Sequence, residues 1–370
     1  MNKIIIGGIS AAVIIGIAAA FALMPSQPNS NQSTNEKLGL VINTPLTTTT
    51  LPELDEIYSQ AASTGIGRSN VYMFWDMIEP EKGQFDWKQS DIIMSFNKKN
   101  NLKVTLYFSI VNGKTLGPFP DWIGKPSLIT VSEDNVVNVL DAVLSRYDII
   151  DTLIISGDTD EHFRYKEGEI PIYRDLFNNV YDRIKEKHPD VKIGNSFALH
   201  NVLNKNIENV VKELSIGDFV AFSYFPVDAL NEIVKTPYQA RADLDKAFEL
   251  AQNKQVALFE ISWSTSSHVE GNEFDQTQFV NQVYEFFNEN ENQIEFVTWY
   301  RMYDRPDGSC IINAEELEGA VSVGGGSGFG SSEFVAERLG NYICSAGLIS
   351  EDGNEKPSWN EFKKEISALS

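Results

Sequence analysis

Residues 256–263 read VALFEISW, and this stretch gives the clearest indication of the fold. A short run that is almost wholly apolar is typical of a strand buried on both faces of a parallel sheet. Similar runs, rich in Val, Ile and Phe, lie at residues 38–43, 68–74, 103–109, 152–157, 192–197, 219–223 and 296–300. The chain therefore contains eight candidate strands.

Longer segments with apolar residues every three or four positions separate these runs, as at Val136, Val139, Leu140 and Val143. Strands that alternate with helices predict a parallel sheet, because a parallel crossover needs a connection of helix length. Eight such units over about 330 residues predict a single-domain (β/α)₈ barrel, an α/β fold, across residues 37–370. An open doubly wound sheet is the structural alternative. No GxGxxG or GxxxxGK[ST] motif supports its usual nucleotide site.

The N-terminal segment favours a location outside the cytoplasm. Residues 4–24 are apolar or small apart from Ser10, and this segment is long enough to span a membrane. Residues 1–24 are therefore expected to be a transmembrane anchor or a signal peptide. Residues 25–36 are polar and predict a flexible linker. We therefore expect a protein at the cell surface or outside the cell, with the membrane as a partner through its N-terminal segment.

Charge and cysteine content argue against a nucleic-acid-binding protein and against a metal site. With 30 Lys and Arg against 52 Asp and Glu, the net charge is −22, so a nucleic-acid partner is not expected. The sequence has no CxxC or HExxH motif, and neither a metal site nor a cofactor is predicted. Outside the cell, Cys310 and Cys344 favour a disulfide, and free buried thiols are the alternative.

Carboxylates at the predicted strand ends are the candidate catalytic groups. Glu260 lies within an apolar strand, where an ionised carboxylate is costly unless it is paired or needed by a site. A structural ion pair with Arg68 or Arg301 is the alternative for this residue. Asp158, Asp160 and Glu161 follow the fourth strand, and a solvated acidic loop is their alternative. Two carboxylates across a barrel mouth are the groups that hydrolyse glycosides.

Aromatic residues occur at matching positions. Trp75, Tyr224, Trp263 and Trp299 lie at or just after strand ends, where aromatic rings can stack on the apolar faces of sugars. Each ring taken alone is more often part of a core.

Several motifs resemble those of the clan A glycoside hydrolases, which are retaining enzymes with a (β/α)₈ barrel. The resemblance is strongest at residues 75–87, WDMIEPEKGQFDW, which is similar to that family's W-x-x-I-E-P-x-x-G-x-F-D-W passage. It continues in SYFP at 223–226, FEISW at 259–263, VTWY at 297–300 and EDGNEKPSW at 351–359.

The resemblance implies roles for individual residues. Glu260 would be the nucleophile, Tyr224 would orient it, Arg68 would support it and Trp299 would form the floor of a sugar subsite. The family has Gly-Asn-Glu after strand four, where its Glu is the general acid/base, whereas this chain has Gly-Asp-Thr at 157–159. A threonine hydroxyl cannot protonate a leaving group at neutral pH, so Glu161 or Asp158 would have to replace it.

Three functions follow from these observations, of which the third, a purely structural envelope protein, leaves Glu260 and the aromatic residues unexplained. The first is a retaining glycosidase or transglycosidase that acts on an oligo- or polysaccharide. The second is a catalytically impaired barrel that binds a glycan or a partner in the cell envelope.

Overall fold

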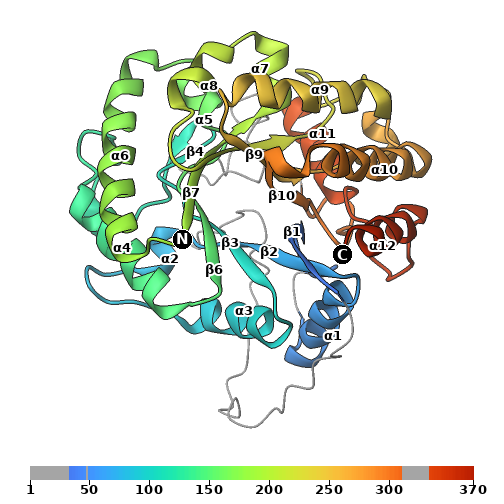
Figure 1. Cartoon of the computed structure of the whole chain (residues 1–370), viewed down its shortest axis with the longest axis horizontal. Coiled ribbons are helices and arrows are strands. Elements are labelled where there is room, and N and C mark those ends of the chain that lie inside the picture. The colour runs from blue at the N-terminus through green and yellow to red at the C-terminus, as the bar shows by residue number, and fades with distance from the viewer. Residues whose placement is uncertain (1–32, 47–48, 311–332) are drawn as a thin grey trace.

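The computed structural model describes residues 33–46, 49–310 and 333–370, and within them the predicted barrel is confirmed (Figure 1). Eight parallel strands close in the order β1-β10-β9-β8-β7-β6-β3-β2. Their bounds are β1 Asn35–Leu40, β2 Ile66–Tyr72, β3 Lys103–Tyr107, β6 Ile150–Ile154, β7 Lys192–Ala198, β8 Phe219–Tyr224, β9 Gln255–Ile261 and β10 Ile294–Trp299. Each of the eight apolar runs overlaps one of these strands.

Helices surround the barrel, as Figure 1 shows. The longer ones are α1 Leu51–Ala62, α3 Lys88–Lys99, α4 Glu133–Arg146, α6 Ile170–Lys187, α9 Pro237–Leu250, α10 Glu273–Asn290, α11 Glu333–Cys344 and α12 Pro357–Leu369. Short helices follow several strands: α2 Trp75–Ile78, α5 Thr159–Phe163, α7 Leu199–Lys205 and α8 Glu208–Leu214. The segment after β3 contains the hairpin of β4 Val111–Asn112 and β5 Thr115–Leu116.

Amphipathic helices bury one face against the outside of the barrel. In α10 the buried face includes Phe279, Val283, Phe286 and Phe287, at the spacing expected of one helix face. The side chain of Asn272 caps the start of α10 by accepting a hydrogen bond from the amide of Asp275 at 2.8 Å. This helix forms the layer against which the last strands of the barrel pack.

The two ends of the barrel have different roles. We call the end at which the strands finish the mouth, and the opposite end the base. At the base, the side chain of Asn35 donates a hydrogen bond to the carbonyl of Leu369 at 2.9 Å, which joins the first strand to the last helix. β1 thus begins inside the predicted linker 25–36, whose last two residues are part of the barrel.

Other predictions concern residues outside the described part of the chain. The expected anchor or signal segment, residues 1–24, and most of the predicted linker, residues 25–36, lie outside it. None of the described helices combines the length and the apolar character that a membrane crossing requires.

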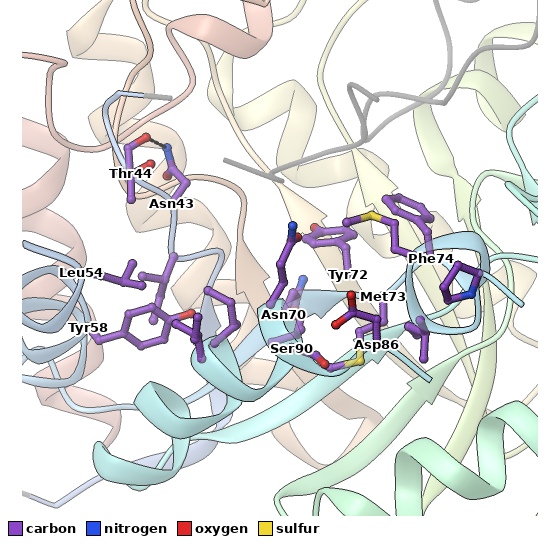
Figure 2. A pocket seen from close by; sticks show the side chains of 18 residues that line it. Asn43, Thr44, Leu54, Tyr58, Asn70, Tyr72, Met73, Phe74, Asp86 and Ser90 are labelled. Atoms are coloured by element: carbon purple, nitrogen blue, oxygen red, sulfur yellow. Dashed lines mark hydrogen bonds between the residues drawn. The ribbon is translucent and has the colours of Figure 1, made fainter. Parts of the chain in front are cut away.

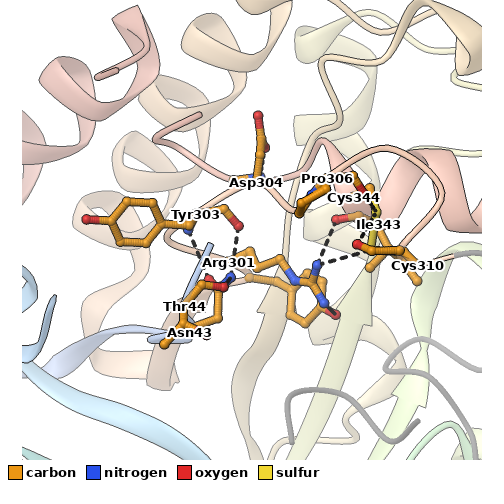
Figure 3. Close-up of a disulfide and its surroundings, with 12 residues drawn as sticks. Asn43, Thr44, Arg301, Tyr303, Asp304, Pro306, Cys310, Ile343 and Cys344 are labelled. Carbon is orange, nitrogen blue, oxygen red and sulfur yellow. Dashed lines mark hydrogen bonds between the residues drawn. A yellow bond between two sulfur atoms is a disulfide. The ribbon is translucent and has the colours of Figure 1, made fainter. Parts of the chain in front are cut away.

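The predicted disulfide is present between Cys310 and Cys344, whose Cα atoms are 5.6 Å apart (Figure 3). It connects the segment after β10 to the end of α11.

Candidate active site

Glu260 lies near the mouth, as the sixth residue of the seven-residue strand β9. Its side chain is almost completely buried, with 2% of its surface exposed. The hydroxyl of Tyr72, the last residue of β2, donates a hydrogen bond to Oε1 of Glu260 across the barrel. No ion pair to Arg68 or Arg301 is found in the described part of the chain, so the structural ion pair that was the alternative for Glu260 is absent there.

Asp158 is the acidic residue of the strand-four loop whose charge acts on Glu260. Ser223 on β8 pairs in register with Glu260, and its hydroxyl donates to Oδ1 of Asp158 at 2.8 Å. Asp158 is 5% exposed and has a left-handed backbone with φ 48°. Such a conformation is uncommon for a residue other than glycine and often marks a functional site. Ser223 thus hydrogen-bonds one buried carboxylate and lies on the strand next to the other.

Close approach of an aromatic ring explains the glycine before Asp158. A Cβ atom added to Gly157 would lie 2.6 Å from the hydroxyl oxygen of Tyr107. That hydroxyl donates to Asn112 at 3.0 Å, and the ring stacks on Phe259 with centroids 5.8 Å apart. Only glycine at position 157 leaves room for this ring beside the carboxylates.

The other residues after the fourth strand point elsewhere. The hydroxyl of Thr159, at the position where the family has its acid, donates to the carbonyl of Ser196 at 3.0 Å. Asp160 accepts a hydrogen bond from the amide of Ala198 at 2.7 Å.

Glu161 faces cations rather than Glu260. It is fully buried in α5, where one oxygen forms an ion pair with Lys205 and the other lies 3.3 Å from Arg164. The alternative of a solvated acidic loop is wrong, because Asp158, Asp160 and Glu161 are all buried.

Burial controls the protonation of the two linked carboxylates. Burial raises the pKa of Glu260 to about 8; the negative charge of Asp158 adds to the rise, while the hydrogen bond from Tyr72 opposes it. Burial also raises the pKa of Asp158 to about 6, against the hydrogen bond from Ser223. Between these pKa values the pair holds a single proton.

Arg68 lies at the base, away from Glu260. Its guanidinium pairs with Asp151, the second residue of β6, at 3.2 Å, and donates to the hydroxyl of Thr105 at 2.9 Å. Arg68 is the third residue of β2, whereas the mouth lies at the end of that strand. The position of Arg68 therefore does not fit the expectation that it supports the nucleophile.

Tyr224 and two tryptophans point out of the barrel. The rings of Tyr224, Trp263 and Trp299 are fully buried, and all three pack on Phe279 of α10, with centroid distances of 6.2, 5.3 and 6.1 Å. The hydroxyl of Tyr224 donates to Asp243 of α9 at 2.6 Å rather than to Glu260. The structure thus places these residues in the core between strands and helices, and Tyr72 takes the position expected for Tyr224.

Trp75 is also part of the core. Its indole nitrogen donates to the carboxylate of Glu79 at 2.7 Å, and its ring packs edge-on against Phe119 and Trp122. The W-x-x-I-E-P passage therefore stabilises the connection after β2, and Trp75 is fully buried.

A cavity of about 360 Å³ adjoins the site, between the ends of β1 and β2 and helices α1 and α3 (Figure 2). Its lining includes Tyr72, whose hydroxyl reaches Glu260. Apolar side chains such as Leu54, Met73 and Ile92 line most of it, and Asn70 and Asp86 add polar groups. This volume lies within the range of small-molecule sites, roughly 300–1,000 Å³.

Solved structures share the fold of this chain. The chain is 12% identical to a GH5_18 variant from Streptomyces cattleya in complex with Manb1-4GlcNAc, over 90% of this chain and 80% of that one, with a TM-score of 0.64. It is 13% identical to a GH5_18 variant from Bifidobacterium longum subsp. longum, also in complex with Manb1-4GlcNAc, over 90% and 78%, with a TM-score of 0.65. It is 14% identical to native xylanase 10B from Thermotoga maritima, over 90% and 95%, with a TM-score of 0.56.

The fold is that of the clan A glycoside hydrolases. At these identities the likeness concerns the barrel alone. No model of a protein family matches the sequence, and no curated protein matches it significantly.

Sequence reasoning did not identify three residues of the site. Tyr72, Ser223 and Tyr107 all lie at the ends of barrel strands and face inward, and strand-end position together with side-chain polarity is the signal that identifies them.

Proposed function

We propose that this protein is a glycoside hydrolase that cleaves or transfers O-glycosidic bonds of an oligo- or polysaccharide with retention of configuration. The observation that carries the proposal is the pair of buried carboxylates, Glu260 and Asp158, held beside Ser223 at the mouth of the barrel. Solved structures with the same fold include glycoside hydrolases bound to Manb1-4GlcNAc, which supports an oligosaccharide as the ligand.

The chemistry requires one ionised and one protonated carboxylate. In a retaining mechanism the ionised group attacks the anomeric carbon, and the protonated group gives its proton to the leaving oxygen. Glu260 is the nucleophile in this proposal and Asp158 the general acid, then the base. The higher pKa of Glu260 leaves the single proton on Glu260 in the empty site. A bound substrate must therefore shift that proton to Asp158 before attack.

Tyr72 has a positioning role in this mechanism. Its hydroxyl donates to Oε1 of Glu260 and stabilises the ionised carboxylate, which is the form that attacks. Tyr72 also lines the cavity between α1 and α3, so a substrate group there would lie beside the nucleophile.

Covalent trapping tests the assignment. The full chain is incubated with a panel of activated 2-fluoro glycosides, and the labelled peptide is mapped by mass spectrometry. Label on Glu260 is expected, whereas label on Asp158 would exchange the two roles. Asp158→Asn should reduce turnover of poor leaving groups more than turnover of activated ones, because only poor leaving groups need the proton. Asp160→Asn is the matched control, because Asp160 is an adjacent buried acid that faces the amide of Ala198.

A catalytically impaired, glycan-binding barrel is the second candidate. The observation that favours it is Thr159, whose hydroxyl lies at the family's acid position and donates to a backbone carbonyl. Absence of both label and turnover, together with equal glycan binding by wild type and Glu260→Ala, would establish this function instead.

We also propose that the barrel lies outside the membrane, held or exported through the apolar segment 4–24. The Cys310–Cys344 disulfide supports this location, because such bonds persist in oxidising compartments. Protease treatment of intact cells should remove the barrel, and its protection until the cells are lysed would refute the location.

A further inference from the structure

Two arginines follow β10 at the mouth, and the catalytic proposal gives neither of them a role. Arg301 comes two residues after the end of the strand, and only 3% of its surface is exposed. Arg305 is partly buried four residues later. Figure 3 shows Arg301 extending toward the disulfide, between the backbone of Ile343 and Cys310.

The groups that accept hydrogen bonds from the Arg301 guanidinium are neutral. Arg301 donates to the carbonyl of Ile343 at 3.3 Å, to the hydroxyl of Tyr300 at 3.3 Å and to the sulfur of Cys310 at 3.6 Å. The Nε atoms of both Arg301 and Arg305 are buried and have no hydrogen-bond partner. In the part of the chain that the structure describes, neither arginine forms an ion pair with a carboxylate.

The nearby carboxylates have other partners. Asp304 lies 2.6 Å from Lys356 and accepts a hydrogen bond from the amide of Gly347 at 2.8 Å. Glu260 accepts its hydrogen bond from Tyr72. The charge of Arg301 opposes the rise in pKa of both Asp304 and Glu260, so these carboxylates offset part of that charge without pairing with it. Burying a cation without a direct partner is costly, and two like charges close together add to that cost. Burial lowers the pKa of Arg305, and the charge of Arg301 lowers it further.

Backbone geometry gives an independent indication. Arg301 has φ 93°, in the left-handed region that residues other than glycine rarely adopt. Strain of this kind is retained where a side chain must be held in a fixed direction, often at a ligand site. Tyr300 accepts a hydrogen bond from Arg301, and the charges of Arg301 and Glu260 both act on the pKa of its hydroxyl.

We infer that Arg301 and Arg305 form an anion-binding subsite beside Glu260, and that the substrate is an acidic glycan. The buried, unpaired Nε–H groups of the two arginines can each donate a hydrogen bond to an oxygen of a carboxylate or a sulfate group. The subsite would hold an acidic substituent on the sugar that lies next to Glu260. This inference rests on the proposed glycosidase function for the identity of its ligand as a sugar.

Anion binding without turnover is the first test. The melting temperature of the full chain is measured at constant ionic strength in chloride, sulfate and D-glucuronate, with D-glucose as the neutral control. Sulfate and glucuronate should raise the melting temperature above its value in chloride. Arg305→Gln should increase at least tenfold the concentration of each anion that gives half of this rise. Arg338→Gln is the control, because Arg338 already pairs with Glu232 at 2.8 Å, and it should stay within twofold of wild type.

Arg301→Gln is the second variant, with the same expected loss. Arg305→Gln keeps the test valid if Arg301→Gln fails to fold, because Arg301 also holds the carbonyl of Ile343. Equal responses to sulfate and chloride in the wild type, or equal losses in Arg305→Gln and Arg338→Gln, would overturn the inference.

An oligosaccharide array separates this inference from the proposed function. The full chain carrying Glu260→Gln is applied to matched acidic and neutral oligosaccharides, and acidic ones should be retained at least tenfold better. Retention of neutral ones alone would overturn the anion subsite and leave the glycosidase standing. Binding of sulfate without binding or cleavage of any oligosaccharide would keep the anion subsite and refute the glycosidase.

Discussion

Replacing the proposed nucleophile should stabilise this protein in alkaline solution. Glu260 has a pKa of about 8 in the folded state against 4.5 for an unperturbed Glu, so the folded protein binds this proton more tightly than the unfolded chain does. Stability therefore falls as the pH rises from about 4.5 to about 8. The difference of about 3.5 in pKa, at about 1.4 kcal/mol for each pKa unit, corresponds to about 5 kcal/mol. Glu260→Gln stays neutral, so it avoids this loss.

Urea unfolding at about pH 5 and about pH 9 measures the effect. Glu260→Gln should differ little from wild type at the lower pH, where both side chains are neutral, and should be more stable by up to about 5 kcal/mol at the higher pH. Glu81→Gln is the control, since Glu81 is exposed and should show the same small difference at both pH values. A Glu260→Gln effect that does not change with pH would refute the argument that the carboxylate is buried at a cost.

Three further outcomes follow from the site and the disulfide. Turnover should rise as the pH passes about 6 and fall as it passes about 8, because the Glu260–Asp158 pair holds one proton only between these values; a flat pH–rate profile would contradict this. Tyr72→Phe removes a hydrogen bond to a charged group, worth about 1.5–3 kcal/mol, and should move the alkaline limb of that profile up by about 1–2 pH units. An unchanged limb would show that Tyr72 does not stabilise the carboxylate. Replacing Cys310 and Cys344 together by serine should lower the free energy of unfolding by about 2–4 kcal/mol, and an unchanged urea midpoint would contradict it.

The strands could be predicted because each is buried on both faces and so forms a run of apolar residues. Prediction of the ends was less accurate: the first strand begins at Asn35, where the polar sequence favoured a linker. Glu260 was found because a lone acid in an apolar strand needs a physical reason.

The direction of side chains at the mouth could not be predicted. In a strand, neighbouring side chains point to opposite faces. An error of one residue in the assumed alignment therefore moves a side chain from the interior of the barrel to the layer between strands and helices. The pairing of β8 with β9 also shifts between Phe222 and Ser223, which changes the alternation at the site itself. The resemblance at residues 223–226 implied that Tyr224 faces Glu260, whereas Ser223 faces Asp158 and Tyr224 faces Asp243.

The hydrogen bond between Asn35 and the carbonyl of Leu369 determines how a tethered barrel would be oriented. The polypeptide enters β1 at the base and α12 ends there, whereas Glu260 lies at the mouth. Any attachment before residue 33 therefore leaves from the face opposite the carboxylates. A barrel held to a membrane by its N-terminal segment would therefore be attached at its base, so the attachment itself would not cover the carboxylates at the mouth.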